Sequence, residues 1–264
     1  MTPVSPVPTD PDMQLVGIPL PSLTAICLTA NRPEYLPLAI ECFLLSDYPN
    51  KKLLVLDTGN DPVSDFGLIP SDPQITYIHS LPLSHGALLN TAVQRSDSDI
   101  CVITDDDDWY PPSRITEQAR ALEESETAAL VAYRKMLFYE VETGDVYQYT
   151  GPDWYGTGNS QCFYRSFWEL NPFSEQPCPD TLFWEAARKQ GVTLVLGDGL
   201  MVARAHRDST CPPCWRAHNF QRIETPVFPE GFELTPKDIK ELTPQKHPYA
   251  QGLLTYRPKL RPLT

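Results

Sequence analysis

The chain has 264 residues, 41% of them hydrophobic, and a formal net charge of −13 at pH 7. This length and apolar content are enough for one sizeable domain with extensions, without disulfides to hold it together. The acidic charge argues against nucleic acid as a partner, because phosphate would be repelled and no long cluster of Lys and Arg offsets it.

The N-terminal residues 1–21 are rich in proline and polar residues and show no periodicity, so we expect a flexible arm before the domain. They lack the basic and apolar stretches of a signal peptide, and no run in the sequence approaches ~18 apolar residues. The seven cysteines are an odd number, which fits free thiols in a reducing compartment. We therefore expect a cytoplasmic protein that makes no membrane contact.

The domain is predicted to begin at residue 22, because the apolar run 23–29 has the pattern of a strand buried on both faces. A helix follows, with Pro33 in its first turn. The segment 84–96 is predicted to be a helix with Ser84 as its N-cap. Strands alternating with helices indicate an α/β fold with a mostly parallel sheet, in which ligands bind beyond the carboxyl ends of the strands. Further strands are predicted at 51–57, 74–80 and 99–105.

The second half, residues 111–210, is predicted to be mixed rather than parallel. It contains a helix that starts near Pro112, longer strand candidates, a loop rich in glycine and aromatic residues, and a helix at 180–191 that ends at Gly191. Two separate strands are expected in "VTLVLG" and "GLMVARAH". Residues 211–264 contain many prolines and few apolar periods, and are predicted to be an extended tail packed on the domain or on a partner.

Four aspartates stand side by side in "ITDDDDWYPP", residues 103–112, directly after a predicted strand. Neighbouring carboxylates repel one another, so the run is expected to hold a positive charge. Mg²⁺ and Mn²⁺ take carboxylate oxygens together with water and phosphates, and aspartates two residues apart can place one carboxylate on the metal and another on a ribose. The alternative is a solvated acidic turn. An EF-hand is excluded, because its glycine and distal glutamate are missing.

In this order along the chain, "LTAICLTANRPEYL", "KKLLVLDTGND", "SHGALLNTAVQRS" and "DICVITDDDDWYPP" resemble the nucleotide-binding half of family 2 glycosyltransferases, which have the GT-A fold. The resemblance covers residues 22–210, with the nucleotide-sugar-binding half at 22–110 and the acceptor half at 111–210. It implies a Rossmann-like, mostly parallel sheet flanked by helices, with a smaller mixed region on the acceptor side. Thr58 departs from the family pattern, which has an aspartate at this position.

The resemblance implies roles for the residues that match the family's motifs. The donor-binding residues that it implies are Thr29, Asn31, Arg32, Asp57, Asn90, Asp105 and Asp106. Asp107 is the implied metal ligand and Asp105 lies nearer the ribose, and a shift of one residue would give these roles to Asp106 and Asp108. His206, in "MVARAH", is implied to complete the metal shell, with a purely structural histidine as the alternative. Arg204 or Arg207 is a further candidate for contact with the diphosphate.

Asp180 matches the general base of inverting members of the family, with Pro179 in place of the usual glutamate. A base is required because a hydroxyl is a weak nucleophile until its proton is removed. Capping of its helix is the alternative role of Asp180, and the two roles are compatible.

Trp154 and Tyr155 lie between glycines and are predicted to form an aromatic platform for the acceptor, because such rings bury a large area and keep a polar edge. Ordinary core or lid packing is the alternative. Trp109 and Trp184 are predicted to be core residues that support the metal loop and the helix of the base.

A zinc site is a competing hypothesis, because Cys211, Cys214, His218 and His206 are spaced closely enough to bind one ion. Only one Cys-x-x-Cys pair is present, however, and its interior is Pro-Pro. The interpretation that we favour is two thiols without a metal.

The sequence therefore predicts a glycosyltransferase that uses Mn²⁺ or Mg²⁺ and transfers a sugar with inversion from a nucleotide-diphosphate sugar, with UDP as the expected nucleotide. The acceptor is left open among a glycan, a small molecule, a protein and a modified nucleobase. Stereochemistry follows from the resemblance, since retaining enzymes share the fold. The alternatives are a nucleotidyltransferase and a catalytically inactive nucleotide-sugar-binding module. The tail is a candidate for a homo-oligomer contact.

Overall fold

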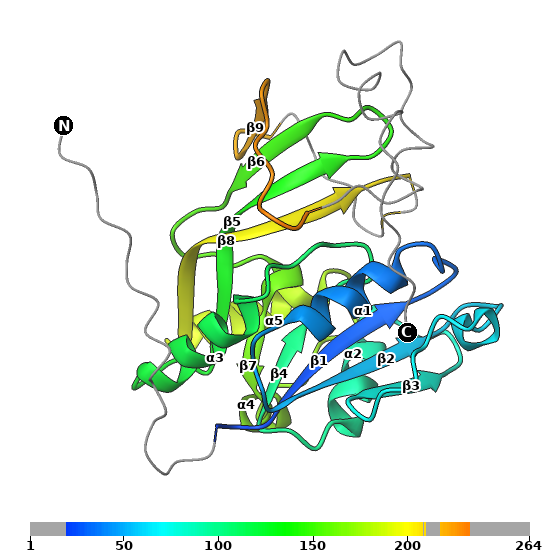
Figure 1. Ribbon diagram of the computed structural model, residues 1–264. Coiled ribbons are helices and arrows are strands. Elements are labelled where there is room, and N and C mark those ends of the chain that lie inside the picture. The colour runs from blue at the N-terminus through cyan, green and yellow to red at the C-terminus, as the bar shows by residue number, and fades with distance from the viewer. Residues whose placement is uncertain (1–19, 208, 210–216, 233–264) are drawn as a thin grey trace.

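The computed structural model describes residues 20–207, 209 and 217–232, and within these residues the strands form one continuous sheet with helices on both faces (Figure 1). The predicted N-terminal arm, apart from its last two residues, and the zinc candidates Cys211 and Cys214 lie outside the described residues. In the described part of the chain, no helix is long and apolar enough to cross a membrane.

The first half of the sheet is parallel. β1 (Leu23–Thr29) lies between β2 (Lys51–Asp57) and β4 (Ile100–Ile103), and β3 (Ile75–His79) pairs with β2 at the edge. The strands predicted at 23–29 and 51–57 match β1 and β2, because both are apolar almost throughout and buried on both faces. The predictions at 74–80 and 99–105 extend beyond β3 and β4 at both ends.

Two layers of helices enclose the sheet. α1 (Leu36–Leu45) and α3 (Arg114–Glu124) pack on one face of the parallel strands. α2 (His85–Arg95), α4 (Arg165–Leu170) and α5 (Pro179–Lys189) pack on the other face. Successive side chains of a strand point to opposite faces of the sheet. One apolar run therefore supplies residues to the hydrophobic core on each face. α2 begins at the predicted cap, where the Ser84 hydroxyl accepts a hydrogen bond from the backbone N–H of Ala87.

The second half of the sheet is mixed, as predicted. β7 (Cys162–Tyr164) pairs antiparallel with both β4 and β5 (Leu130–Glu140), and β6 (Val146–Thr150) pairs antiparallel with β5. β8 (Thr193–Ala205) runs parallel to β5, and β9 (Phe220–Ile223) pairs with β6. Across the described sheet the order is β3-β2-β1-β4-β7-β5-β6-β9. Figure 1 shows β5, β6, β8 and β9 extending beyond the parallel half as a separate lobe of the sheet.

Two features of this half differ from the sequence analysis. β8 is one strand rather than two, because it continues through residues 197–200, where its pairing with β5 shifts and Leu200 has a φ of 49°. A Cβ at Gly199 would lie 2.7 Å from the Tyr133 ring, so this close path requires glycine. The described part of the predicted tail, 217–232, contributes β9 to the sheet. This strand lies beyond residue 210, and the domain boundary predicted there remains a prediction.

Arg114 braces the aspartate loop from inside the protein. It is 1% exposed, and its Nη2 donates to the carbonyls of Ile103 at 2.6 Å and Asn159 at 3.2 Å. Its Nε donates to Gln118 at 3.0 Å, and its guanidinium lies 4.1 Å from the centre of the Tyr110 ring. These contacts join the end of β4 to α3 and to the 3₁₀ turn η2 (Gly158–Ser160).

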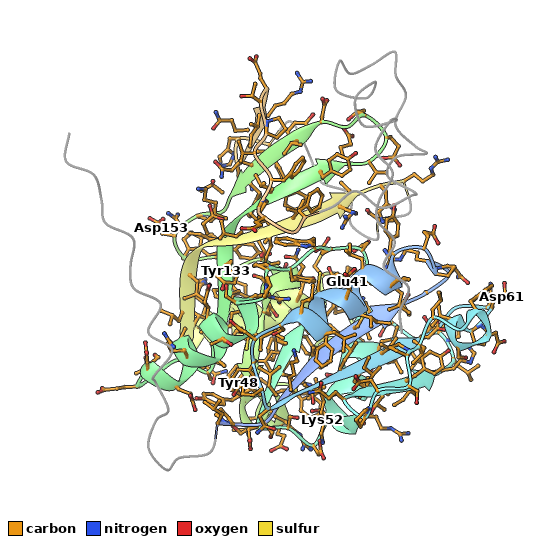
Figure 2. The ribbon with its side chains drawn as sticks, viewed as in Figure 1. Glu41, Tyr48, Lys52, Asp61, Tyr133 and Asp153 are labelled. Carbon is orange, nitrogen blue, oxygen red and sulfur yellow. The ribbon has the colours of Figure 1, made fainter. Side chains whose placement is uncertain are left out.

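A second contact fixes the same helix to the sheet. Tyr133 of β5 donates its hydroxyl proton to Glu117 of α3 at 2.9 Å (Figure 2). α3 is thus held from β4 by Arg114 and from β5 by Tyr133. The loop that carries the four aspartates, between β4 and α3, is therefore anchored at both of its ends.

We expect Arg114→Met to lower the free energy of unfolding by about 2–4 kcal/mol, because the carbonyls of Ile103 and Asn159 would lose a charged donor in a buried site. Arg120→Met, at an exposed position of the same helix, is the control and should change it by less than about 0.5 kcal/mol. Urea unfolding followed by circular dichroism measures both variants. Equal stability of the two variants would contradict the bracing role.

Candidate functional site

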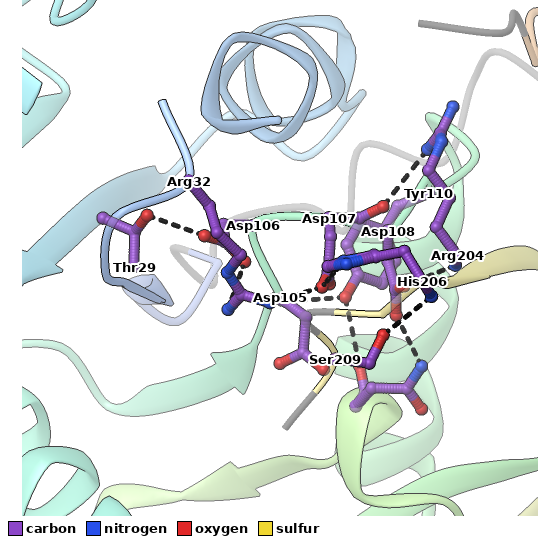
Figure 3. Close-up of polar contacts among 11 residues, drawn as sticks. Thr29, Arg32, Asp105, Asp106, Asp107, Asp108, Tyr110, Arg204, His206 and Ser209 are labelled. Carbon is purple, nitrogen blue, oxygen red and sulfur yellow. Dashed lines mark hydrogen bonds and ion pairs between the residues drawn. The ribbon is translucent and has the colours of Figure 1, made fainter. Parts of the chain in front are cut away.

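Four segments meet at the carboxyl edge of the parallel strands. They are the loop after β1, the aspartate run after β4 and the end of β8, which Figure 3 shows, and the start of α5. Parallel strands bring their carboxyl ends to the same edge of a sheet, which is why residues from distant parts of the sequence converge here.

Asp106 is fully buried and is held by the loop after β1. Thr29 donates its hydroxyl proton to Oδ2 of Asp106 at 2.6 Å, and Nη2 of Arg32 forms an ion pair with Oδ1 at 2.8 Å. Burial raises the pKa of Asp106 to about 8, and the charge of Asp107 adds to this effect while Arg32 opposes it. Thr29 and Arg32, both predicted to bind the donor, thus lie on the aspartate run (Figure 3).

Asp107 joins the aspartate run to the end of β8. Its Oδ2 lies 2.6 Å from Nη1 of Arg32 and 3.0 Å from Nε2 of His206. His206 is buried, and its ring stacks on Tyr35 with 4.7 Å between the ring centres. Burial alone would raise the pKa of Asp107, but the hydrogen bond from His206 and the charge of Arg32 lower it. The structure therefore brings together the two predicted metal ligands, which are 99 residues apart.

Asp105 and Asp108 face different surroundings. Asp108 is buried and accepts hydrogen bonds from the backbone N–H of Arg204 at 3.0 Å and from the side-chain amide of Asn159 at 2.7 Å. The Asp105 carboxylate is partly exposed and makes no hydrogen bond or ion pair with a residue that the structure describes. Burial, together with the charges of Asp107 and Asp180, raises the pKa of Asp105 to about 7, although Arg32 opposes the shift. Asp108 is thus committed to the protein, whereas Asp105 is open to a ligand.

The residues at this site fit a divalent cation. One carboxylate oxygen from each of Asp105, Asp107 and Asp108 lies within 4.8 Å of the others. Neighbouring ligands of an octahedral ion, each at ~2.1 Å from the metal, are ~3.0 Å apart. The separation of Asp107 Oδ2 and His206 Nε2 is 3.0 Å, so both atoms can bind one ion without moving. A donor set dominated by carboxylates suits Mg²⁺ or Mn²⁺.

Asp57 and Asn31 shape the loop beside this cluster. The Asp57 carboxylate is buried and accepts hydrogen bonds from the backbone N–H groups of Gly59 at 2.7 Å and Val63 at 2.8 Å, and from the Tyr77 hydroxyl at 2.9 Å. Asn31 has a φ of 56°, and its side-chain oxygen accepts a hydrogen bond from the backbone N–H of Asn60 at 2.9 Å. Direct contact of either residue with the donor remains a prediction.

Asn90 has a structural role in this geometry. Its side-chain oxygen accepts from Nε1 of Trp168 at 2.8 Å and from the backbone N–H of Phe173 at 2.9 Å, and its amide nitrogen donates to the Phe173 carbonyl at 2.9 Å. None of these contacts involves the aspartates. They join α2 to the segment after α4, so the predicted donor-binding role has no support from these contacts.

Asp180 lies in the first turn of α5, where no side-chain capping hydrogen bond is formed. Its carboxylate packs against Gly158, since a Cβ added at Gly158 would lie 1.9 Å from Oδ2. Its charge reaches Asp105 and also His85, the first residue of α2. His85 is exposed, but neighbouring protein atoms displace part of its hydration. This desolvation lowers the pKa of His85, and the charge of Asp180 opposes the shift. Asp180 thus interacts electrostatically with both the aspartate run and α2.

The predicted aromatic platform is divided between surface and interior. Trp154 is 53% exposed, with the Arg188 guanidinium 5.2 Å from the centre of its ring. The Tyr155 hydroxyl lies 3.3 Å from the hydroxyl of Thr181, the residue after Asp180. The core positions predicted for Trp109 and Trp184 are confirmed, at 5% and 0% exposure.

Several residues of the site lie outside the motifs that the sequence pattern singles out. Tyr35, Asn159 and His85 were not selected, although Tyr35 and His85 are aromatic or titratable residues next to recognised motifs. Their position beside "TANRP" and "GALLN" was a usable signal. Asn159 lies in a glycine-rich loop, and only the fold brings it to Asp108. Arg207, at an exposed position, contacts Glu142, whereas Arg204 is buried and donates to the Asp107 carbonyl at 3.3 Å.

Residues 24–170 match the family described as Glycosyl transferase family 2. No curated protein sequence matches the chain significantly. Among solved structures, S. aureus TarS 1–349 has a TM-score of 0.55 and 14% identity, over 69% of this chain and 60% of that one. Its complex with UDP-GlcNAc has a TM-score of 0.58 and 14% identity, over 71% and 60%.

The mannosyltransferase PcManGT from Pyrobaculum calidifontis, in complex with GDP-Man and Mn²⁺, has a TM-score of 0.55 and 18% identity, over 70% of this chain and 56% of that one. The chain thus spans 56–60% of the length of these solved structures. Their similarity at such low identity concerns the fold. It confirms the predicted GT-A fold.

Gly158→Ala is expected to displace the Asp180 carboxylate, because the new methyl group would overlap both its oxygen and its Cγ, at 1.9 and 2.6 Å. A crystal structure of the variant measures the displacement. Gly197→Ala is the control, since nothing lies within 4 Å of a Cβ at that position. An Asp180 carboxylate that keeps its position in the Gly158 variant would contradict the close contact.

The pH dependence of stability in EDTA tests the electrostatics of the run. A carboxyl whose pKa rises on folding binds its proton more tightly in the folded state, which stabilises the fold at low pH. This contribution is lost as the pH rises from 3.8, the ordinary pKa of the carboxyl, through the pKa in the folded state. With folded pKa values of about 7 for Asp105 and about 8 for Asp106, the melting temperature should fall between pH 5 and 8, by on the order of a few degrees.

Asp106→Asn should flatten this fall, whereas Asp97→Asn, at an exposed position of the surface, should keep it. Thermal melts at half-unit pH intervals measure all three proteins. A wild-type melting temperature that is constant or rises over this range would contradict the assignment.

Proposed function

This chain belongs to glycosyl transferase family 2, and on that basis we propose that it transfers a sugar from a nucleotide-diphosphate sugar to an acceptor hydroxyl, with a divalent cation and with inversion. The observation that carries the proposal is the convergence of Asp107, His206 and Arg32 at the carboxyl edge of the sheet. We propose residues 22–110 as the donor half and 111–210 as the acceptor half.

For the donor we propose a UDP-sugar. The complex of TarS with UDP-GlcNAc supports a nucleotide-sugar donor, and the complex of PcManGT with GDP-Man makes GDP the first alternative to test. Asp105 has the open carboxylate of the run and is proposed to hydrogen-bond the ribose. Asp57 and Asn31 support the neighbouring loop, and we propose that this loop lies against the base.

The leaving diphosphate requires positive charge. Mn²⁺ or Mg²⁺, held by Asp107 and His206, would supply it as a Lewis acid. Arg32 adds a second cation at the same edge, 2.6 Å from Asp107. Asp106, which accepts a hydrogen bond from Thr29, pairs with Arg32, and Tyr35 stacks on the His206 ring. These contacts keep Asp106 and the His206 ring oriented before the substrate binds.

Asp180 is proposed to be the general base. It takes the proton of the acceptor hydroxyl as the hydroxyl oxygen forms a bond to the anomeric carbon, while the bond from that carbon to the phosphate oxygen breaks and the nucleoside diphosphate leaves. Displacement in one step inverts the anomeric centre. The contact with Gly158, and the hydrogen bond from Gln161 to the Asp180 carbonyl at 2.9 Å, fix the position of this residue. Trp154, exposed near α5, is proposed to pack against the acceptor.

Nucleoside-diphosphate release from a panel of nucleotide sugars, with Mn²⁺ and mixed acceptors, tests the proposal. We expect release by the wild type to fall at least about 10²-fold in Asp107→Asn, because the metal ligand is lost, and in Asp180→Asn, because the base is lost. Asp180→Asn should still bind the donor in calorimetry, since the base is not a donor ligand. Asp97→Asn is the matched exposed control and should keep full activity.

The alternatives predict different results. Metal-dependent donor binding with no release by the wild type would favour an inactive binding module. Release of pyrophosphate from nucleoside triphosphates would favour a nucleotidyltransferase. Unchanged release in Asp180→Asn would contradict the assigned base.

A further inference from the structure

Arg32 bridges two aspartates with different surroundings. Its Nη2 pairs with Oδ1 of Asp106 at 2.8 Å, and its Nη1 pairs with Oδ2 of Asp107 at 2.6 Å. The Asp106 side chain is fully buried and is also fixed by Thr29, whereas the Asp107 side chain is 11% exposed at the open side of the site. The guanidinium therefore has one fixed anchor and one partner that a ligand can reach (Figure 3).

The Asp107 oxygen that faces Arg32 also faces His206. Oδ2 accepts from Nη1 of Arg32 at 2.6 Å and lies 3.0 Å from Nε2 of His206. A carboxylate oxygen offers two lone-pair positions, so these two contacts occupy both. A cation held by both Asp107 and His206 would take the place of the contact between them, and Arg32 would then face that cation across the same oxygen.

The chemistry of the two groups decides which contact is replaced. Neutral imidazole has a lone pair and can become a ligand of the same ion from its present position. Guanidinium has no lone pair to offer and always carries a positive charge, so it can only be repelled. The positive charge of Arg32, 2.6 Å from the same oxygen, is therefore what opposes a cation at Asp107.

We infer that Arg32 competes with the divalent cation for Asp107, and that metal binding turns its Nη1 toward the donor diphosphate while Nη2 stays on Asp106. This inference rests on the proposed function, from which it takes the metal and the diphosphate. Arg32 then couples the binding of the metal to the binding of the diphosphate, because the metal releases the Nη1 group that donates a hydrogen bond to the diphosphate. Arginine suits this exchange, because its fork can hold a carboxylate with one nitrogen and a phosphate with the other.

The inference predicts effects of opposite sign for one substitution. Without nucleotide, Arg32→Gln should bind Mn²⁺ more tightly than the wild type, on the order of tenfold, because the competitor is removed. With saturating Mn²⁺, the same variant should bind UDP more weakly, also on the order of tenfold, because the phosphate contact is lost. Titration calorimetry with MnCl₂, and then with UDP, measures both affinities.

The control is Arg95→Gln, which removes one positive charge from an exposed position at the end of α2. It should leave both affinities unchanged. Repeating the Mn²⁺ titration in 1 M NaCl separates direct competition from long-range repulsion, since the Debye length is then about 3 Å. A difference between Arg32→Gln and the wild type that persists in high salt supports direct competition, and one that disappears contradicts it.

Mn²⁺ affinity that is unchanged or lower in Arg32→Gln overturns the inference and leaves the proposed metal site intact. A wild type that binds no Mn²⁺ instead contradicts the metal-dependent function itself. If Arg32→Gln does not fold, the wild type still decides the question by NMR of its arginine side chains during titration with Mg²⁺. The Arg32 signal should move before nucleotide is added, and a signal that stays in place overturns the inference.

Discussion

The mutual repulsion of four consecutive carboxylates is the constraint that organises this site. In a buried turn their charges cannot be separated by water, so each carboxylate needs either a proton or a partner. The fold supplies partners from three elements. Thr29 and Arg32 come from the loop after β1, His206 and the Arg204 backbone from β8, and Asn159 from η2.

This arrangement separates the run into two pairs with different surroundings. Asp106 and Asp108 point into the protein, where Thr29 and Asn159 hold them. Asp105 is partly exposed, and the Asp107 side chain is 11% exposed at the same edge. The register of the proposed metal ligands, which the residue types leave ambiguous, remains a prediction at Asp107.

The parts of this account that follow from the sequence are those encoded by neighbouring residues. Continuous apolar runs predicted β1 and β2, and the strand ends located Asp57 and the aspartate run at one edge. The sequence does not predict contacts between distant residues. The stacking of His206 on Tyr35 and the bracing by Arg114 depend on how the mixed half of the sheet is aligned with the parallel half. β8 was divided in two because Gly197 and Gly199 resemble a turn, whereas the second of these glycines allows a close approach to Tyr133.

The most direct test of the central claim is a crystal structure of the protein with Mn²⁺ and UDP, with anomalous diffraction to locate the metal. The account predicts one anomalous peak in contact with both Oδ2 of Asp107 and Nε2 of His206, and adjacent to the diphosphate. A peak bound by Asp108 without Asp107, or a nucleotide bound at this edge with no metal beside Asp107, would contradict it.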